Sequence, residues 1–313
     1  MSSLDALLQR SEQDSFWSRF CRSSTESVAQ YVYGQGSTAL WKKTTHNLVH
    51  VVCVSDTHNT KPNLPDGDIL IHAGDLTESG TKEELEKQID WLDSQPHRYK
   101  IVIAGNHETF LDRNYHSHHG NERVTIDWKS LIYLENTSAI LDLGAGRQLK
   151  VFGSPYTPKH GNGAFQYPRT DTTIWKEIPK DTDLLVTHGP PKAHLDLGHL
   201  GCRVLRQALW EMESRPLLHV FGHIHGGYGK EVVYWDLCQR AYEAIMDGES
   251  RWWNLCVLLY SWIPRLFFDW TADGRATVLV NAAAVGGVRD LKRREAICVD
   301  IQAGSNRFLS GCT

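Results

Sequence analysis

Short apolar runs separated by polar turns dominate the chain from Leu48 onwards. Each run is rich in β-branched residues and ends at a polar turn, which is typical of a buried strand. These runs read LVHVVCVSD, DILIHAGD, YKIVIAGNHE, IYLEN, LKVFGSP, DLLVTHGPP and LLHVFGHIH. Between the second and third runs, Thr81 and Glu84 predict the start of a helix that carries apolar residues at Leu85, Ile89 and Leu92. This alternation of strands and helices predicts an α/β domain with helices covering a central sheet.

The segments at either end of this pattern differ in character. Residues 1–47 predict an N-terminal extension of short amphipathic helices, with a connecting loop over 33–39. Residues 48–313 predict the main domain, interrupted by a helical insertion at about 231–270 that holds five of the eleven Trp and is broken at Gly248 and Pro264. Strand character returns in RATVLVNAAAV, and REAICVDI predicts the closing strand. Three roles stay open for the insertion: a helical hairpin packed on the domain, a wall of the substrate pocket, or a surface that contacts a membrane or a protein partner.

Charge and cysteine usage narrow the class of protein. The formal net charge is −4 and the pI is about 6.5, so the chain lacks the basic surplus of a protein that binds duplex nucleic acid. The seven Cys form no CxxC pair, which favours reduced thiols and a cytoplasmic location. The first residues contain no signal-peptide pattern, and no apolar run is long enough to predict a transmembrane segment.

Candidate metal ligands follow five of the apolar runs. In α/β sheets, the loops beyond the carboxyl ends of strands form the ligand crevice, so these residues can converge although they lie far apart in sequence. Oxygen and imidazole donors without a thiolate suit Mn, Fe, Zn or Co and argue against a structural zinc site. The candidate ligands are Asp56, His58, Asp75, Asn106, His188, His223 and His225.

Seven donors exceed the needs of one transition metal but suit two divalent ions that share a bridging carboxylate. Two ions roughly 3.5–4 Å apart stabilise the attacking and leaving oxygens of an in-line displacement at phosphorus, and a hydroxide shared between them is the expected nucleophile. Gly74, Gly105 and Gly222 each precede a candidate ligand, which predicts tight turns and a close approach of the backbone.

The motifs DTH, GD, GNHE, THG and GHIH, in this order, resemble the calcineurin-like metallophosphoesterase superfamily over about residues 48–230 and the strand near 276–285. The resemblance implies a β-sandwich of two sheets flanked by helices, a four-layer α/β (α+β) fold. It also implies that Asp75 bridges two ions and that His107 contacts the phosphate and protonates the leaving oxygen. One ion would be held by Asp56, His58 and His225, and the other by Asn106, His188 and His223.

The longer segments VSDTH, GDILIHAGDLTESG and HVFGHIHGGYG look like a small metallophosphoesterase-domain-containing subfamily, whose members are associated with phosphodiesters, including cyclic nucleotides. Some of these relatives carry glycine where this chain has His223, so both metal sites are expected to be complete here. The segment GDLTESG departs from the Asp-Arg-Gly pattern of Ser/Thr protein phosphatases. We therefore expect a hydrolase, a metal-dependent phosphodiesterase acting on a small soluble substrate. The alternatives are hydrolysis of a phosphomonoester or a non-phosphate bond of an apolar metabolite, and a non-catalytic metal-binding scaffold.

Overall fold

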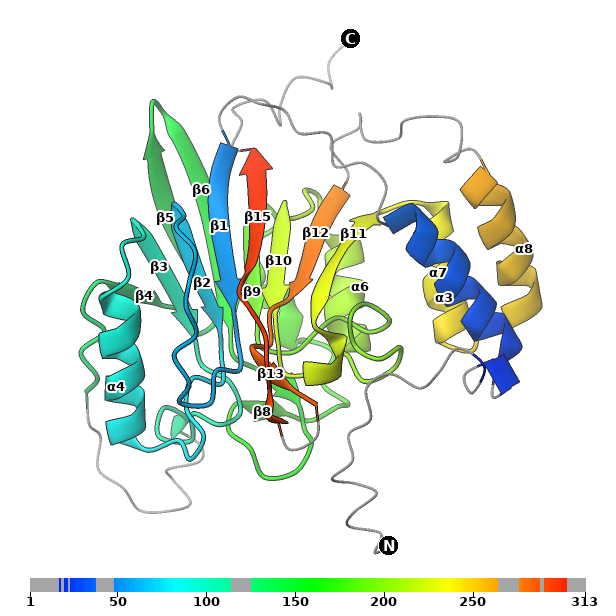
Figure 1. Cartoon of the computed structure of the whole chain (residues 1–313). Coiled ribbons are helices and arrows are strands. Elements are labelled where there is room, and N and C mark those ends of the chain that lie inside the picture. Colours follow the sequence, from blue (N-terminus) through cyan, green and yellow to red (C-terminus); the bar gives the residue numbers. More distant parts are fainter. Residues whose placement is uncertain are drawn as a thin grey trace, which may run out of the picture.

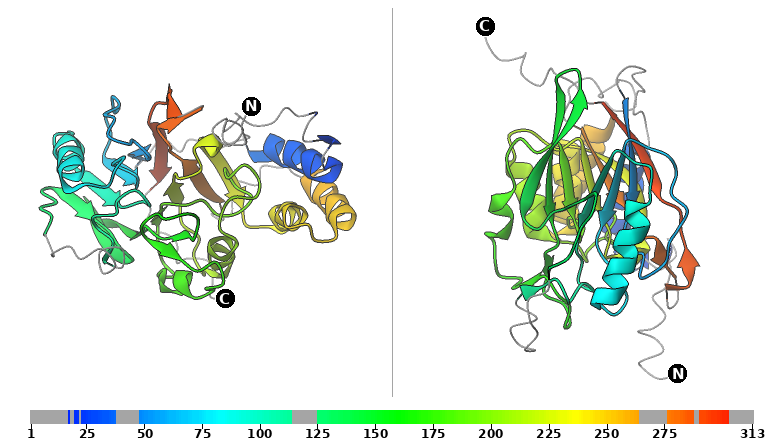
Figure 2. Two further views of the ribbon diagram at one scale, coloured as in Figure 1. Left: turned by 90° about the horizontal axis from the view of Figure 1, so that it is seen from below. Right: turned by 90° about the vertical axis from the view of Figure 1, so that its left-hand side faces the viewer.

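Two β-sheets face each other, and helices cover their outer faces (Figures 1 and 2). The computed structural model describes residues 17, 20–21, 23–37, 48–113, 125–263, 276–287 and 290–302, and the structural statements below concern these residues. This architecture confirms the predicted mixed α/β fold. The predicted helices of residues 1–16 and the predicted break at Pro264 lie outside the described residues.

The first sheet has five strands in the order β15-β1-β2-β3-β4. Four of them run parallel, and the closing strand β15 pairs antiparallel with β1. Their bounds are β1 (Leu48–Val54), β2 (Ile69–Ala73), β3 (Tyr99–Ile103), β4 (Leu131–Tyr133) and β15 (Ile297–Gln302). The apolar runs of the sequence therefore predicted every strand of this sheet.

The second sheet has six strands in the order β11-β12-β10-β9-β6-β5, of which the inner four are parallel and the two edge strands antiparallel. Their bounds are β5 (Thr137–Gly144), β6 (Arg147–Ser154), β9 (Leu184–Thr187), β10 (Leu218–Phe221), β11 (Gly229–Tyr234) and β12 (Ala276–Asn281). Sequence reasoning missed both edge strands. One face of an edge strand meets solvent, so β5 and β11 carry too few apolar residues to stand out.

The core of the molecule lies between the two sheets. It is built from alternate strand residues such as Val51, Ile71, Val186 and Val220, all of which are fully buried. Helix α4 (Lys82–Asp93) covers the outer face of the first sheet, and α6 (Arg203–Glu211) covers that of the second. The Thr81 side chain accepts a hydrogen bond from the Glu84 backbone nitrogen at 3.3 Å, which confirms the predicted start of α4.

Shorter elements complete the described fold. They are the strand pairs β7 (Thr157–Pro158) with β8 (Gln166–Tyr167) and β13 (Val285–Gly286) with β14 (Lys292–Arg293), and the 3-10 turns η1 (Ile174–Glu177) and η2 (His225–Gly227).

Three helices form a separate cluster beside the second sheet, on the right of Figure 1. They are α3 (Ser24–Ser37), α7 (Leu237–Met246) and α8 (Arg251–Trp262). Two predictions about this part of the chain were wrong. The loop predicted over 33–39 is helical as far as Ser37, because Tyr33 is buried against Tyr242 and packing overrides the low helix propensity of Gly34. The insertion is not helical from residue 231, because β11 occupies its beginning, whereas the break at Gly248 is confirmed.

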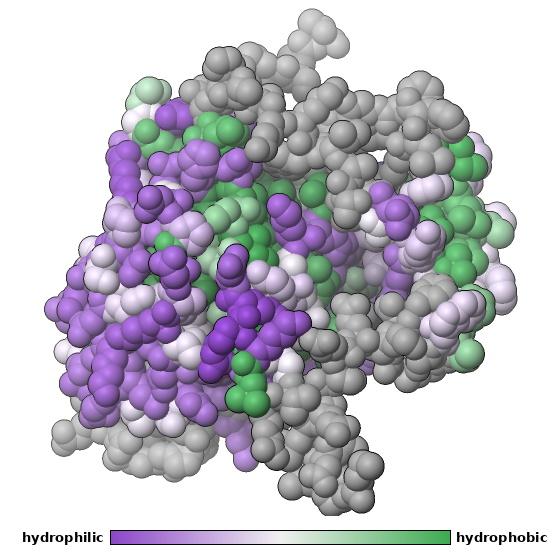
Figure 3. Space-filling view, in the orientation of Figure 1, coloured by the Kyte–Doolittle hydropathy of each residue, from purple (hydrophilic) through white to green (hydrophobic). Residues whose placement is uncertain are grey.

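Helix α8 is apolar on two sides. Leu255 and Leu258 pack into the cluster, whereas Trp252, Trp253 and Tyr260 are each more than 70% exposed. Figure 3 shows the apolar surface at the right-hand edge of the molecule, over α8. None of the described helices is long and apolar enough to cross a bilayer. Contact of the 231–270 segment with a membrane surface or a partner stays a prediction.

The parallel strands of both sheets end at the same edge of the sandwich, which is the lower edge in Figure 1 and faces the viewer in the left panel of Figure 2. The loops after β1, β2 and β3 of the first sheet and after β9 and β10 of the second meet there. This edge is where the sequence placed its candidate ligands.

Candidate metal centre

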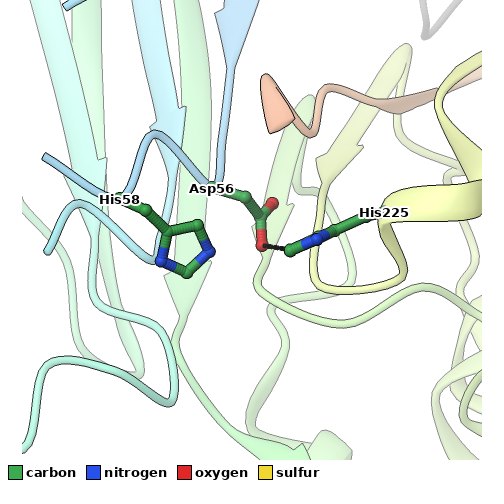
Figure 4. A group of neighbouring side chains, drawn as sticks. All are labelled: Asp56, His58 and His225. Atoms are coloured by element: carbon green, nitrogen blue, oxygen red, sulfur yellow. Dashed lines mark hydrogen bonds and ion pairs between the residues drawn. The ribbon is translucent and has the colours of Figure 1, made fainter. Parts of the chain in front are cut away.

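The first group of candidate ligands consists of Asp56, His58 and His225, whose donor atoms lie within 4.8 Å of one another. Figure 4 shows Asp56 and His58 coming from the loop after β1 and His225 from the opposite side, after β10. The His225 Nε2 lies 3.2 Å from Asp56 Oδ1. The Nε2 atom of His58 is buried and has no hydrogen-bond partner among the described residues. A buried nitrogen without a partner is costly unless it binds something, so it is a candidate ligand atom.

The second group consists of Asp75, His188 and His223, again with donor atoms within 4.8 Å of one another. The His188 Nε2 lies 3.3 Å from Asp75 Oδ2 and 3.0 Å from the side-chain oxygen of Asn106. The structure therefore brings Asn106 to this group as well.

A third group joins the first two. It consists of His58, Asp75 and His107, so that His58 is shared with the first group and Asp75 with the second. All eight residues singled out from the sequence lie in this one assembly. The donor set of carboxylate, amide and imidazole suits divalent transition metals.

In three of the histidines, a hydrogen bond at Nδ1 determines which ring nitrogen faces the centre. The Nδ1 atoms of His58 and His188 donate to the carbonyl oxygens of Thr77 (3.2 Å) and Ala73 (2.9 Å). The His225 Nδ1 donates to Asp290 Oδ1 at 2.7 Å. Because carbonyl and carboxylate oxygens only accept, Nδ1 carries a proton in each ring, so Nε2 is the atom that faces the centre and can bind a cation once it is deprotonated. This is the arrangement that a metal-binding histidine needs.

Four of the candidate ligands have a strained backbone. Asp56, His58, Asp75 and His223 have φ values of 52°, 42°, 53° and 64°, in the left-handed region that most residues avoid. Such conformations cost roughly 1–3 kcal/mol each and persist where the surrounding structure holds them, commonly at functional sites.

Two glycines allow the chain to pack this tightly. A β-carbon on Gly74 (φ 95°) would lie 2.6 Å from both the Ala104 oxygen and His188 Nδ1. A β-carbon on Gly222 would overlap the Asp56 carboxylate and the Ser55 hydroxyl. The close approach predicted from the sequence is therefore what the structure requires at these positions.

The charged groups of the centre shift one another's pKa values. Burial would raise the pKa of Asp56, but the hydrogen bond and charge of His225 outweigh burial and lower it to about 2. Burial opposes ionisation of Asp75 too, yet His188 holds its pKa far below the usual range. Burial would lower the pKa of His188 and His225, but neighbouring carboxylates raise these values to about 9 and about 10.

The pKa of His223, in contrast, is lowered to about 4 by burial and by the charge of His188. In the absence of an ion, the carboxylates of the centre thus hold protons on His188 and His225. A bound cation would take the place of these protons.

The residues behind the ligands were not assigned a role from the sequence. The buried carboxylate of Glu108 accepts hydrogen bonds from the backbone nitrogens of Gly105 (2.6 Å), Asp75 (3.0 Å) and Thr77 (2.9 Å). Glu108 therefore ties the loop after β3 to the loop after β2. Its position as the last residue of the GNHE motif could have indicated this role. Asp290 belongs to no motif, so sequence reasoning could not have linked it to His225.

Two further histidines lie buried behind the candidate ligands. His72 and His219 are fully buried, and their Nε2 atoms lie 3.0 Å from the Thr57 hydroxyl and 2.8 Å from the Thr187 hydroxyl. Each threonine adjoins a candidate ligand, so both histidines support the centre from within the sheets.

Comparisons with known proteins agree with this geometry. Residues 45–227 match the calcineurin-like phosphoesterase family. The human and mouse proteins named metallophosphoesterase domain-containing protein 1 are each 38% identical, over 57% of this chain and 61% of their own length. A protein of Emericella nidulans named probable rhamnogalacturonate lyase C is 95% identical over 310 residues, which make up 99% of this chain but 30% of that protein. The chain thus spans less than two thirds of each of these relatives.

Proposed function

Since the chain belongs to the calcineurin-like phosphoesterase family, we propose that it hydrolyses a small phosphodiester with the help of two divalent cations. The observation that supports this most strongly is the pair of donor groups, Asp56-His58-His225 and Asp75-His188-His223, joined by the group His58-Asp75-His107. Two independent metal sites would not need residues in common. A shared carboxylate is what a dinuclear centre requires.

The proposed ligands follow from the groups. One ion would be held by Asp56, His58 and His225, the other by Asn106, His188 and His223, and both by the bridging Asp75. Cations bound there would neutralise charge on the phosphoryl oxygens and lower the pKa of water, which supplies the nucleophile at neutral pH. Manganese, iron and zinc all suit these donors.

His107 is the proposed general acid. Its Nδ1 atom donates a hydrogen bond to the Glu78 carbonyl at 2.7 Å, and its backbone nitrogen donates to Asp75 Oδ1 at 2.9 Å. These bonds hold the ring in one orientation and leave Nε2 as the atom that carries a proton to the leaving oxygen. The His107 ring packs edge-on against the His58 ring, with 4.6 Å between the ring centroids, so His107 lies beside the proposed ligands.

The preference for a small phosphodiester rests on the likeness of the sequence to the metallophosphoesterase-domain-containing proteins, and their name gives no substrate. A phosphomonoester or a non-phosphate ester is the alternative substrate, and a non-catalytic scaffold is the alternative role. The name of the fungal relative adds a competing activity, cleavage of rhamnogalacturonan, for a protein of which this chain spans 30%. No contact among the described residues favours that activity over phosphoester hydrolysis.

The test is a panel of substrates assayed with one preparation of the whole chain reconstituted with Mn²⁺. We expect hydrolysis of bis(p-nitrophenyl) phosphate, slower hydrolysis of p-nitrophenyl phosphate, no cleavage of rhamnogalacturonan, and loss of activity with a chelator. The variant Asp75→Asn, which keeps the size of the side chain but removes its charge, should be inactive. Faster hydrolysis of the monoester would replace the diester assignment. Cleavage of rhamnogalacturonan, or full activity of Asp75→Asn, would overturn the proposed function.

A further inference from the structure

The two buried histidines behind the centre occupy equivalent places in the two sheets. His72 lies on β2 and His219 on β10, and each of these strands pairs with a parallel neighbour, β1 or β9. That neighbour leads into a fully buried threonine: Thr57 lies in the loop after β1, and Thr187 ends β9. One histidine–threonine pair therefore stands at the ligand edge of each sheet.

The first pair holds the loop that carries two ligands of the first group. Thr57 lies between Asp56 and His58 in the sequence. Its hydroxyl lies 3.0 Å from His72 Nε2 and donates to the Leu76 oxygen at 3.4 Å. These contacts join the loop after β1 to β2 and to the loop after β2. Because both ligands have a left-handed backbone, contacts of this kind are needed to keep their conformation.

The second pair holds His188 of the second group. The Thr187 hydroxyl donates to the Gly189 oxygen at 2.8 Å, so one side chain spans the backbone of His188. The Nε2 atom of His219 lies 2.8 Å from the same hydroxyl. Since the hydroxyl proton is directed at Gly189, His219 is the donor of this second hydrogen bond. The histidine thus fixes the side chain that in turn fixes the ligand.

An imidazole is a costly residue at these two positions. Burial lowers the pKa of His72 and of His219 to about 3, so both rings are neutral at neutral pH. The Nδ1 atom of each ring is buried without a hydrogen-bond partner among the described residues. Such an atom costs free energy that an apolar side chain would not. What the apolar side chain could not supply is the hydrogen bond to the threonine.

We propose that His72 and His219 are positioning residues, each of which sets the affinity for one of the two proposed ions. His72 acts through Thr57 on the ion of the first group, and His219 acts through Thr187 on the ion of the second group. This inference rests on the proposed pair of cations. It gives each ion a support of its own, so that the two affinities can be changed one at a time.

The test is a titration of Mn²⁺ into the metal-free chain, fitted to two association constants. His72→Leu and His219→Leu remove the hydrogen bond and place an apolar side chain in the strand. His72→Gln and His219→Gln retain a polar group that can reach the threonine hydroxyl.

The matched control is His97→Leu. His97 is buried as well, and its Nδ1 atom also lacks a partner among the described residues. Its Nε2 atom, however, donates to the Pro65 oxygen at 3.0 Å, just before β3 begins and therefore at the opposite end of that strand from the ligands.

We expect His72→Leu to lower one association constant about fivefold and His219→Leu to lower the other by a similar factor. This is less than the roughly 10-fold loss for a direct partner of a ligand, because each histidine acts through a threonine. The double leucine variant should lower both constants, and each glutamine variant should stay within about twofold of the wild type. His97→Leu should leave both constants unchanged, whatever its Tm.

The threonines provide a second route to the same result. Thr57→Val and Thr187→Val remove the other partner of each hydrogen bond, so they should lower the same two constants, which keeps the test open if a leucine variant does not fold. Combining Thr57→Val with His72→Leu should cost little more than the larger of the two single effects, because both remove one contact. Fully additive losses would mean that His72 does not act through Thr57 and would overturn the inference.

Two further outcomes distinguish this inference from the function on which it rests. If the wild type binds two ions but both leucine variants lower the same constant, lower both equally or change neither, the inference alone is overturned. A folded wild-type chain that binds one ion or none would overturn the proposed dinuclear function, and this inference with it.

Discussion

Replacing Asp290 should lower the affinity for one of the two proposed ions and leave the affinity for the other unchanged. The Asp290 carboxylate accepts a hydrogen bond from His225 Nδ1 at 2.7 Å and so orients the Nε2 atom towards the first ligand group. A carboxylate behind a metal-binding histidine also makes the imidazole a stronger ligand.

The size of the effect follows from the exposure of the aspartate. Loss of such a carboxylate typically costs 10-fold to 100-fold in metal affinity. Because the Asp290 side chain is 39% exposed, solvent screens its charge. We therefore expect a loss of affinity near the lower limit of this range. Asp290→Ala should lower the affinity of the first group for its ion about tenfold, which corresponds to about 1.4 kcal/mol. Asp290→Asn retains an oxygen that can accept the hydrogen bond, so its effect should be smaller, about threefold.

The assay is a competition titration of Mn²⁺ into metal-free protein with a chelator of known affinity, fitted to two binding constants. Asp181→Asn serves as the matched control, since Asp181 forms an exposed ion pair with Lys150. The reasoning is refuted if Asp290→Ala leaves both constants unchanged, or if it weakens both equally. An equal loss at both sites would mean that His225 does not belong to a single ion.

Three further predictions concern other residues of the fold. Gly222→Ala should lose most of its metal binding because the new methyl group overlaps the Asp56 carboxylate; native metal content would contradict the packing argument. His107→Gln should keep its metals and lower kcat for alkyl diesters about 100-fold or more, with a smaller loss for p-nitrophenyl esters, whose leaving group needs no proton; equal losses would exclude the general-acid role. The pKa of His194 is raised to about 10, because its interactions with Glu231 and Glu243 outweigh its burial. Its protonation therefore stabilises the fold fully below about pH 6.5, and this contribution is lost as pH rises through about 10. Urea denaturation should show a steeper fall in stability from pH 7 to pH 10 for the wild type than for Glu231→Gln, and parallel curves would contradict this.

The candidate centre was visible in the sequence because parallel strands end at one edge of a sheet. Once β1, β2 and β9 were recognised from their β-branched runs, the polar residues at their ends had to converge. The ends of these strands are clear in the sequence, since β2 and β9 are buried throughout and β1 is buried from Val51 to Val54.

The rest was hidden for specific physical reasons. Strand β5 has one exposed face and carries no continuous apolar run. Helix α3 continues through Gly34 because of tertiary packing, which local propensity does not report. The left-handed backbone of Asp56 and His223 could not be read from residue type, since glycine is the usual signal for it. Asp290 reaches His225 across 65 residues of sequence, and only the folded chain joins them.

The number of donors predicts two ions, and the structure adds which residues the candidate groups have in common. The three overlapping groups single out His58 and Asp75 as the shared residues, a distinction that the motifs alone do not make. The cytoplasmic location stays a prediction. The division of the chain into an extension, a main domain and an insertion stays one too.

The central claim is that two cations share Asp75, and elemental analysis of the purified chain after reconstitution with Mn²⁺ tests it most directly. Wild-type protein and the variants Asp75→Ala and His223→Ala should be compared, with folding checked by circular dichroism. The account predicts about two ions per wild-type chain, about one in His223→Ala, and less than one in Asp75→Ala, because the bridging carboxylate serves both ions. One ion or none in the folded wild-type chain, or two ions retained without Asp75, would contradict it.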